Sequence, residues 1–329
     1  MAFAPVPFLV ALRGLGQGCH ITNGQTWTVG IGTALRLSSM AVFVFGFAVP
    51  WGLSGPVLGG GMFLVGIGAE TVYVLAMLYN KPQWTTRSDA PTLSLRQYFH
   101  YAGPLMVGSL FNQMANPIFV YMLNRGMSPG DNGAAYDLIR DTAWVLFSTL
   151  MIVQPVIVRH ATSSENLRVI MRFMYYLVAG ILIAAVALAA SPLRDAIFIK
   201  LMQLDKPEIR NLTYAALLCL IPMPLIHLLN LATAAMHTRS GHTIWVTAGN
   251  AVAVVGLSIV ALMMDFSAYN GVIVAVIAWA SFNLTIAIIQ AVGLIITGLE
   301  AVVHPGTLAE RLHDRRHSTV RTPISENRA

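Results

Sequence analysis

The sequence predicts an all-α polytopic membrane protein with about eight transmembrane helices. Hydrophobic residues make up 56% of the 329 residues and charged residues only 10%, whereas about a quarter of a soluble domain is charged. The mean hydropathy is +0.66, and the apolar residues fall into runs long enough to cross a bilayer core of about 30 Å. These runs lack an alternation of period two, which disfavours a transmembrane barrel.

The apolar runs predict eight spans after a short apolar stub at 1–12. The spans are 27–49, 52–79, 98–123, 133–158, 170–191, 211–236, 243–264 and 270–298. The stub has neither a basic n-region nor a small-residue cleavage site, so the first full span is expected to direct insertion.

The distribution of Lys and Arg over the loops predicts the orientation, because these residues are enriched on the cytoplasmic side. Thirteen lie on one side: Arg13, Lys81, Arg87, Arg96, Arg159, Arg168, Arg172, Arg239, Arg311, Arg315, Arg316, Arg321 and Arg328. Five lie on the other: Arg125, Arg194, Lys200, Lys206 and Arg210. We therefore expect the 13–26 loop and the C-terminal tail in the cytoplasm, and a chain integral to a bacterial inner or plasma membrane.

Two segments are too polar to span the bilayer. Residues 192–210 carry Leu193, Ile197, Leu201 and Leu204 at helical spacing, which predicts an amphipathic helix along the outer interface. The tail at 301–329 is polar and rich in Arg, and is expected to be disordered and solvated, with contact to anionic lipid as the alternative.

An internal repeat relates residues 4–34 to residues 221–251 with an offset of 217 and no gap. Nine of the 31 positions are identical, where biased composition would give about two or three. The identical pairs are Pro5/Pro222, Pro7/Pro224, Leu12/Leu229, His20/His237, Gly24/Gly241, Thr26/Thr243, Val29/Val246, Gly32/Gly249 and Ala34/Ala251.

The second copy of this repeat closes a bundle of six spans, whereas the first copy is preceded only by the stub. The pattern therefore predicts the remnant of two parallel six-helix repeats, related by an axis along the membrane normal. The expected divisions are the end of an N-terminal bundle at 1–80, a cytoplasmic linker at 81–97, a complete six-helix bundle at 98–300 and the tail. Three alternatives would explain the absent helices: a gene model that starts late, a fragment, or a shortened relative. For a fragment or a shortened relative, a partner chain would supply these helices.

A Pro-led span follows the polar linker in "LRQYFHYAGPLMVGSLFNQMANPIFVYML", and the chain opens "FAPVPFLVALRGLGQG" before "ALRL" and "GIGAETVYVLAMLY". With two bundles of six, this arrangement resembles the multidrug/oligosaccharidyl-lipid/polysaccharide flippase superfamily, which includes the MATE exporters. The opening series is most similar to the progressive ankylosis protein family. The resemblance covers residues 3–300 and is most specific over 3–80.

The resemblance implies a secondary exporter of organic anions, drugs or lipid-linked sugars that works by alternating access. The chain lacks the first four helices, where MATE proteins keep an acidic residue that couples transport to a cation. A proton or a sodium ion is the candidate coupling ion, and no cofactor is expected.

The sequence carries no motif of a soluble enzyme or of nucleotide binding. The glycines of "GLGQG" lack the dinucleotide-binding spacing, and "HTRSGH" has no further metal ligands nearby. Nucleic acid is not an expected partner, because the basic residues lie in short loops between apolar runs. We therefore expect no enzymatic activity, and energy for transport from an ion gradient or from the gradient of the solute.

Ionisable side chains within the spans are the strongest functional signal, since a charge in hydrocarbon must face a cavity or a partner. Asp137, Arg140 and Asp141 share one helical face of the fourth span. One cation between two carboxylates could take up a proton or a sodium ion. The alternative is a solvated cluster at the outer end of the helix.

Arg36 and Glu70 are the ionisable residues of the first two spans. They are expected either to pair across the hairpin, which would be structural, or to present charge to a central cleft. An arginine in that cleft would suit an anionic solute.

Two pairs of polar residues lie within other spans. Asn112 and Asn116 are spaced i,i+4 and either line a solute path or bond neighbouring helices. His227 and Asn230 follow a proline break, where freed carbonyl groups often face a cavity. The alternatives for His227 are a satisfied interior histidine and a proton relay.

The leading functional prediction is a secondary transporter in the lipid bilayer that moves an organic anion or amphiphilic solute. A flippase for lipid-linked oligosaccharide or polysaccharide is the alternative within this class. A membrane helper or inactive fragment that does not transport is the alternative of another class.

Overall fold

A computed structural model describes residues 5–22, 24–48, 50–53, 55–79, 94–190, 192–201 and 204–298. Within these ranges the chain is helical, and its one β-type contact is an isolated bridge between Met127 and Asn270. The chain forms two compact units, Met1–Pro91 and Thr92–Ala329, which are described separately. The predicted tail and most of the predicted linker lie outside the described residues.

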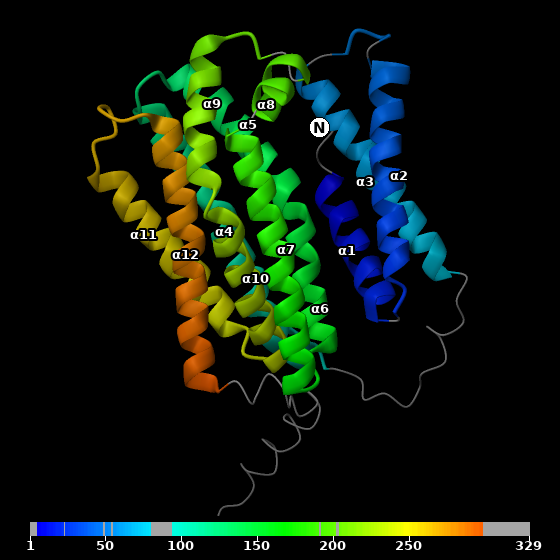
Figure 1. The fold of residues 1–329 in the computed structure, drawn as a ribbon. Coiled ribbons are helices and arrows are strands. Elements are labelled where there is room, and N and C mark those ends of the chain that lie inside the picture. The colour runs from blue at the N-terminus through cyan, green and yellow to red at the C-terminus, as the bar shows by residue number, and fades with distance from the viewer. Residues whose placement is uncertain are drawn as a thin grey trace, which may run out of the picture. The chain divides into compact units, whose positions relative to one another are not determined.

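The first unit contains three helices, of which the third packs against both of the others. They are α1 (Val6–Thr22), α2 (Thr26–Phe43, continued by a π-helical turn, Val44–Ala48) and α3 (Gly55–Tyr79). Both α1 and α2 pack against α3, which therefore forms the centre of this unit (Figure 1). Gly16 permits the close approach of α1 to α3, because a Cβ there would clash with the Val74 side chain.

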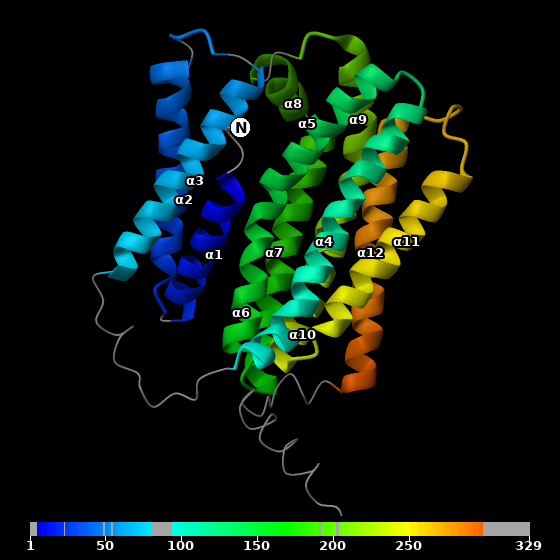
Figure 2. The same cartoon turned by 180° about the vertical axis from the view of Figure 1, so that it is seen from behind.

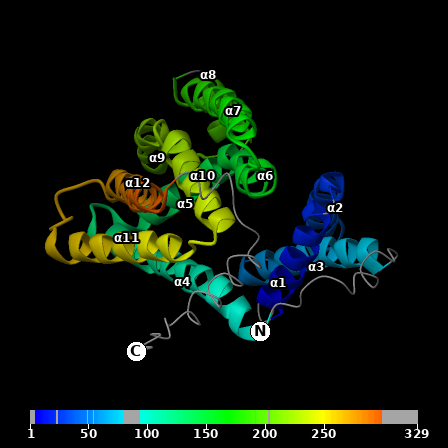
Figure 3. The same cartoon turned by 90° about the horizontal axis from the view of Figure 1, so that it is seen from below.

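The second unit is a helical bundle with a continuous apolar core. Its helices are α4 (Leu95–Arg125), α5 (Pro129–Phe147), a 3-10 turn (Ser148–Ile152), α6 (Val153–His160), α7 (Ser164–Ala190), α8 (Pro192–Asp195), a π-helical turn (Ala196–Leu201), α9 (Pro207–Leu220), α10 (Met223–Ser240), α11 (Ile244–Met263) and α12 (Gly271–Thr297). A capping box between Ser94 and Gln97 starts α4. Figure 3 shows α4 lying along α11, where Gly108 packs against the backbone of Thr247.

Six helical stretches among the described residues are long and apolar enough to cross a membrane: Trp27–Ala48, Val57–Tyr79, Pro129–His160, Ser164–Ala189, Ile244–Met263 and Gly271–Thr297. The bent pair α9–α10 makes a seventh if it is counted as one span. Within the described residues, the predictions of a helical chain and of helices long and apolar enough to cross a membrane are confirmed. Of the eight predicted spans, 98–123 is a continuous helix but falls outside this set, because amide side chains such as Asn112 make α4 more polar.

Two of the predicted elements are wrong in detail. The predicted span 211–236 is broken at Ile221–Pro222, where α9 and α10 meet at a bend of 51°. Pro222 and Pro224 lack the N–H groups that would continue the helix of α9. The predicted amphipathic helix at 192–210 is instead the short α8 and a π-helical turn, and Pro207 opens α9 anew.

The N-terminal stub is longer than predicted. Helix α1 continues ten residues beyond the predicted end of the stub at residue 12, to Thr22, through a segment predicted to be a cytoplasmic loop. Arg13 therefore lies within a helix of the first unit and not in a loop. The extra turns exist because Arg13, Gln17 and His20 all bond α3.

The sequence repeat corresponds to a repeated local structure, α1–α2–α3 in the first unit and α10–α11–α12 in the second. Gly24 and Gly241 end the first helix of each set with φ of 78° and 75°, a left-handed conformation that favours glycine. Nε2 of His20 lies 3.2 Å from the carbonyl oxygen of Val74, and Nε2 of His237 lies 2.7 Å from that of Gln290. Each histidine thus ties the first helix of its set to the third.

Asp195 on α8 is held by α9 in a way that predicts a dependence on pH. The Tyr214 hydroxyl donates to the carboxylate at 2.7 Å, and this bond, with Arg194 beside it, lowers the pKa of Asp195 below its usual range. A lowered pKa stabilises the contact above about pH 4, and the stabilisation is lost as the pH falls through the pKa of the folded state.

We expect Tyr214→Phe to reduce amide hydrogen-exchange protection in Ala196–Leu201 at neutral pH. The wild-type protein should lose the hydrogen-exchange protection of Ala196–Leu201 only when the pH is lowered. Tyr176→Phe, which removes an exposed hydroxyl from α7, is the matched control. Equal protection in both variants at neutral pH would contradict the contact.

Candidate functional site

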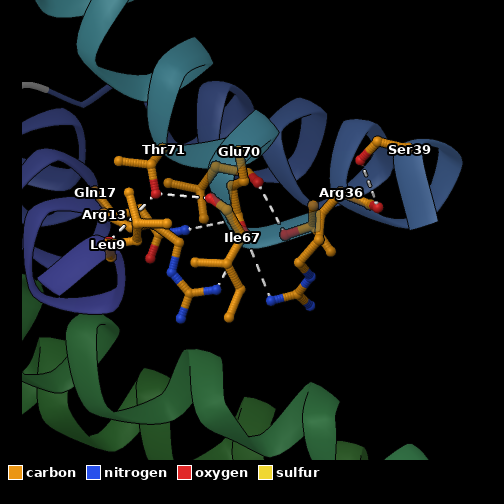
Figure 4. Close-up of polar contacts among 10 residues, drawn as sticks. Leu9, Arg13, Gln17, Arg36, Ser39, Ile67, Glu70 and Thr71 are labelled. Atoms are coloured by element: carbon orange, nitrogen blue, oxygen red, sulfur yellow. Dashed lines mark hydrogen bonds and ion pairs between the residues drawn. The ribbon is translucent and has the colours of Figure 1, made fainter. Parts of the chain in front are cut away.

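The described residues of the first unit bring four polar side chains together between three apolar helices. We call Arg13, Gln17, Arg36 and Glu70 the Glu70 cluster. Glu70 is 1% exposed and lies on α3, facing α1 and α2 (Figure 4). Its oxygens lie 3.0 Å from Nη1 of Arg13 and 3.4 Å from Nη1 of Arg36, and the Gln17 amide donates to it at 2.8 Å.

The local packing explains why a carboxylate lies at this position. A Cβ at Gly32 would lie 3.4 Å from Cγ of Glu70, and one at Gly66 would lie 3.1 Å from Cγ of Arg36. The absence of side chains at these two glycines lets α2 approach α3 closely enough for the pair to form. Thr71 also joins α1 to α3, with its hydroxyl 3.2 Å from the carbonyl oxygen of Leu9.

The two arginines differ in how firmly they are held. Arg13 is 20% exposed and makes the shorter contact with Glu70, from the same helix face as Gln17. Arg36 is 31% exposed and touches the carboxylate only at 3.4 Å. A guanidinium group has five N–H donors, so Arg36 retains donors that Glu70 does not use.

The charges of the Glu70 cluster do not cancel. Two guanidinium groups face one carboxylate, which leaves the cluster with a net charge of +1. Charges within apolar helices are costly unless they are paired or face a polar cavity. The excess positive charge gives this unit an electrostatic preference for an anion.

Sequence reasoning anticipated the pair of Arg36 and Glu70 but missed Arg13 and Gln17. These two residues were assigned to a loop, although their i,i+4 spacing places them on one face of a helix. That spacing was the signal that could have identified them. The equivalent positions in the second copy, at the offset of 217, are Asn230 and Ala234, so the cluster is not repeated.

The second unit contains a polar cavity of about 220 Å³ between α4, α5 and α12, which we call the amide cavity. Its lining residues are Asn112, Gln113, Ala115, Asn116, Phe119, Tyr136, Arg140, Trp144, Trp279 and Phe282. The amides of Asn116 and Gln113 bond each other at 3.1 Å. Asn112 and Asn116 thus line a cavity, which is consistent with the first of their two predicted roles, lining a solute path. That they bind a solute stays a prediction.

The predicted group of Asp137, Arg140 and Asp141 is divided by the structure. Arg140 lies 3.0 Å from Asp137 and 3.9 Å from Asp141, and its guanidinium lies over the ring of Tyr136. Arg140 lines the amide cavity, whereas the side chains of Asp137 and Asp141 are 62% and 72% exposed and do not line it. The two carboxylates therefore form an exposed group beside the cavity.

His227 and Asn230 lie on one face of α10 and contact different partners. The His227 ring stacks on Phe147 at 5.6 Å and meets Trp144, a wall of the amide cavity, edge-on at 6.2 Å. Both ring nitrogens are buried without a hydrogen bond of normal geometry. The Asn230 amide donates to Asn283 on α12 at 3.1 Å, which supports the role of bonding adjacent helices.

Further polar contacts continue from Asn230 along the contact between α10 and α12. The Thr233 hydroxyl lies 2.7 Å from Oε1 of Gln290, and both side chains are buried. His237 follows one turn later, at the carbonyl group of Gln290. Since these donors and acceptors are removed from solvent, their bonds stabilise the packing of α10 on α12.

The residues that the structure describes contain no group of three or more His, Cys, Asp or Glu side chains placed to hold a metal ion. No family model matches the chain, and no curated protein or solved structure matches it. The chemistry of the Glu70 cluster and of the amide cavity is therefore the basis for assigning a function.

Proposed function

We propose that the chain is a secondary transporter that carries an organic anion or an anionic amphiphile across a membrane. The Glu70 cluster carries this proposal, because it places a net charge of +1 beside α2 and α3, two helices that are long and apolar enough to span a bilayer. Such a charge is costly in hydrocarbon and is compensated by a bound anion.

Within the cluster, Arg36 is the proposed contact for the solute and Arg13 is the structural partner of Glu70. This division follows from the shorter contact and lower exposure of Arg13. The amide cavity of the second unit is by itself a separate polar surface, with amide donors, Arg140 and the rings of Trp144 and Trp279. The proposed mode of transport is alternating access.

The test is export of labelled solutes from proteoliposomes, comparing organic anions, cationic dyes and lipid-linked sugars, with and without a proton gradient. We expect transport of organic anions, and a loss of about 10- to 100-fold in the Arg36→Gln variant. That range corresponds to one hydrogen bond to a charged group. The Arg13–Glu70 contact remains in this variant, so its fold should be retained.

Arg96→Gln is the matched control, because it removes one positive charge at an exposed position near the start of α4. It should transport at the unchanged rate. Export of cationic dyes alone, or equal anion rates in the Arg36→Gln and Arg96→Gln proteins, would contradict the proposal. Absence of transport for all three solute classes would favour the helper that does not transport.

A further inference from the structure

The second unit holds a larger cavity that the proposed transport function does not use. It lies between α4, α11 and α12, has a volume of about 500 Å³, and is called here the apolar cavity. Figures 1 and 2 show α11 and α12 diverging toward the turn that joins them, residues 264–270. The space between the diverging ends is lined from both helices, by Gly256 and Val260 on one side and Ile277 and Ser281 on the other.

The lining of the apolar cavity selects a ligand that needs no hydrogen bonds. Its fourteen lining residues include no charged side chain and no amide. Three hydroxyl groups belong to lining residues, those of Tyr269, Ser281 and Thr285, and the Thr285 hydroxyl already donates to the carbonyl oxygen of Ser281 at 2.8 Å. A hydrocarbon chain matches this surface, whereas a polar solute would lose its hydration without compensation.

The rim of the apolar cavity indicates where such a chain comes from. Val260, Met264 and Ile277 line the cavity and are 41%, 45% and 51% exposed. Two of them lie on α11 and α12, both apolar and long enough to cross a membrane, so the exposed faces meet the hydrocarbon of a bilayer. The cavity is therefore continuous with the lipid that surrounds the bundle.

The end of the cavity at the 264–270 turn is polar. Tyr269 lines the cavity there, and its carbonyl oxygen accepts a hydrogen bond from the backbone of Met127. Asp265 lies in the same turn, and Ser267 together with nearby Arg125 lowers the pKa of its carboxyl group. Tyrosine and charged residues are typical of the interface between hydrocarbon and water, where the polar head of a lipid lies.

We propose that the apolar cavity binds one acyl chain of a membrane phospholipid, with the head group at the 264–270 turn. The chain enters between α11 and α12 and lies against Gly256. This binding is independent of the proposed transport function, since none of the Glu70 cluster contributes to it.

Gly256 offers a direct test, because a Cβ added there meets no atom within 4 Å. Leucine at this position should fill part of the cavity without disturbing the helices. The wild-type protein, extracted in mild detergent and analysed by native mass spectrometry, should retain phospholipid. Gly256→Leu should retain about tenfold less, the loss expected when roughly two methylene groups of the chain are displaced, and Gly256→Ala should lie between them.

Gly180→Leu is the matched control, because Gly180 on α7 is also open within 4 Å and does not line the cavity. It should retain phospholipid like the wild type. The temperature at which the Cys219 thiol becomes reactive to a maleimide should be the same in both leucine variants, measured in a Cys19→Ser background. Equal temperatures exclude misfolding as the cause of lipid loss. Equal lipid retention by Gly256→Leu and Gly180→Leu would overturn the proposal.

Discussion

Glu70→Leu should destabilise the first unit by about 3–5 kcal/mol, the usual cost of removing one partner from a buried group of charges. Glu70 is 1% exposed and accepts contacts from Arg13, Arg36 and Gln17. Without the carboxylate, two guanidinium groups face each other among apolar helices and lose their compensation. Glu70→Gln should be intermediate, because its amide oxygen can still accept a hydrogen bond from Arg13.

The two cysteines allow the units to be followed separately, since Cys19 lies on α1 and Cys219 on α9. In a Cys219→Ser background, the temperature at which Cys19 becomes reactive to a maleimide reports the first unit. An unchanged temperature in Glu70→Leu would show that the carboxylate contributes nothing to the packing of the three helices.

The triple variant Arg13→Met, Arg36→Met, Glu70→Leu separates the structural role from the proposed functional one. Replacing a whole buried ionic group by apolar residues of similar size is often neutral for stability. We expect the triple variant to regain most of the stability lost in Glu70→Leu but to transport no organic anion. A stable triple variant that still transports at the wild-type rate would contradict an anion site in the Glu70 cluster.

Gly126→Val should produce the largest effect in the second unit. A Cβ at Gly126 would lie 2.6 Å from Cα and 2.8 Å from the nitrogen of Gly271, the first residue of α12. These are backbone atoms and cannot rotate away, so α4 and α12 must separate. Overpacking of this kind costs about 1–3 kcal/mol or more.

Separation at this point also breaks neighbouring contacts. The Asn132 amide bonds the carbonyl group of Leu123, and the Met127 backbone bonds Tyr269. In a Cys19→Ser background, Gly126→Val should therefore lower the temperature at which Cys219 becomes reactive to a maleimide. Gly133→Ala is the control, since its Cβ meets open space and alanine favours a helix interior by up to about 1 kcal/mol. A lower transition for Gly133→Ala than for Gly126→Val would refute the close contact.

Much of the local structure follows from residues close together in the chain. Apolar runs predicted most of the long helices of both units, and the shared Pro, His and Gly residues predicted the correspondence between α1 and α10. Gly24 and Gly241 have the same left-handed conformation because each ends a helix and is followed by the same short turn. Such features depend on neighbouring residues, so composition and spacing reveal them.

The sequence indicated the break between α9 and α10 only in part. Pro222 and Pro224 marked a weak point, but the span at 211–236 was still predicted as one helix. After the 51° bend, α10 packs against α12 through Asn230, Thr233 and His237. These partners lie more than fifty residues away in the sequence.

The sequence by itself determined a helical chain with segments long and apolar enough to span a membrane, an internal repeat and a few ionisable residues in apolar surroundings. Only the tertiary structure decided that Arg13, 57 residues before Glu70, joins Arg36 at the same carboxylate. It also placed Arg140 at a cavity with Asn112 while leaving Asp137 exposed. The physical reason is that a charge within apolar helices needs a partner, and the side chain that meets this need is set by which helix faces pack together.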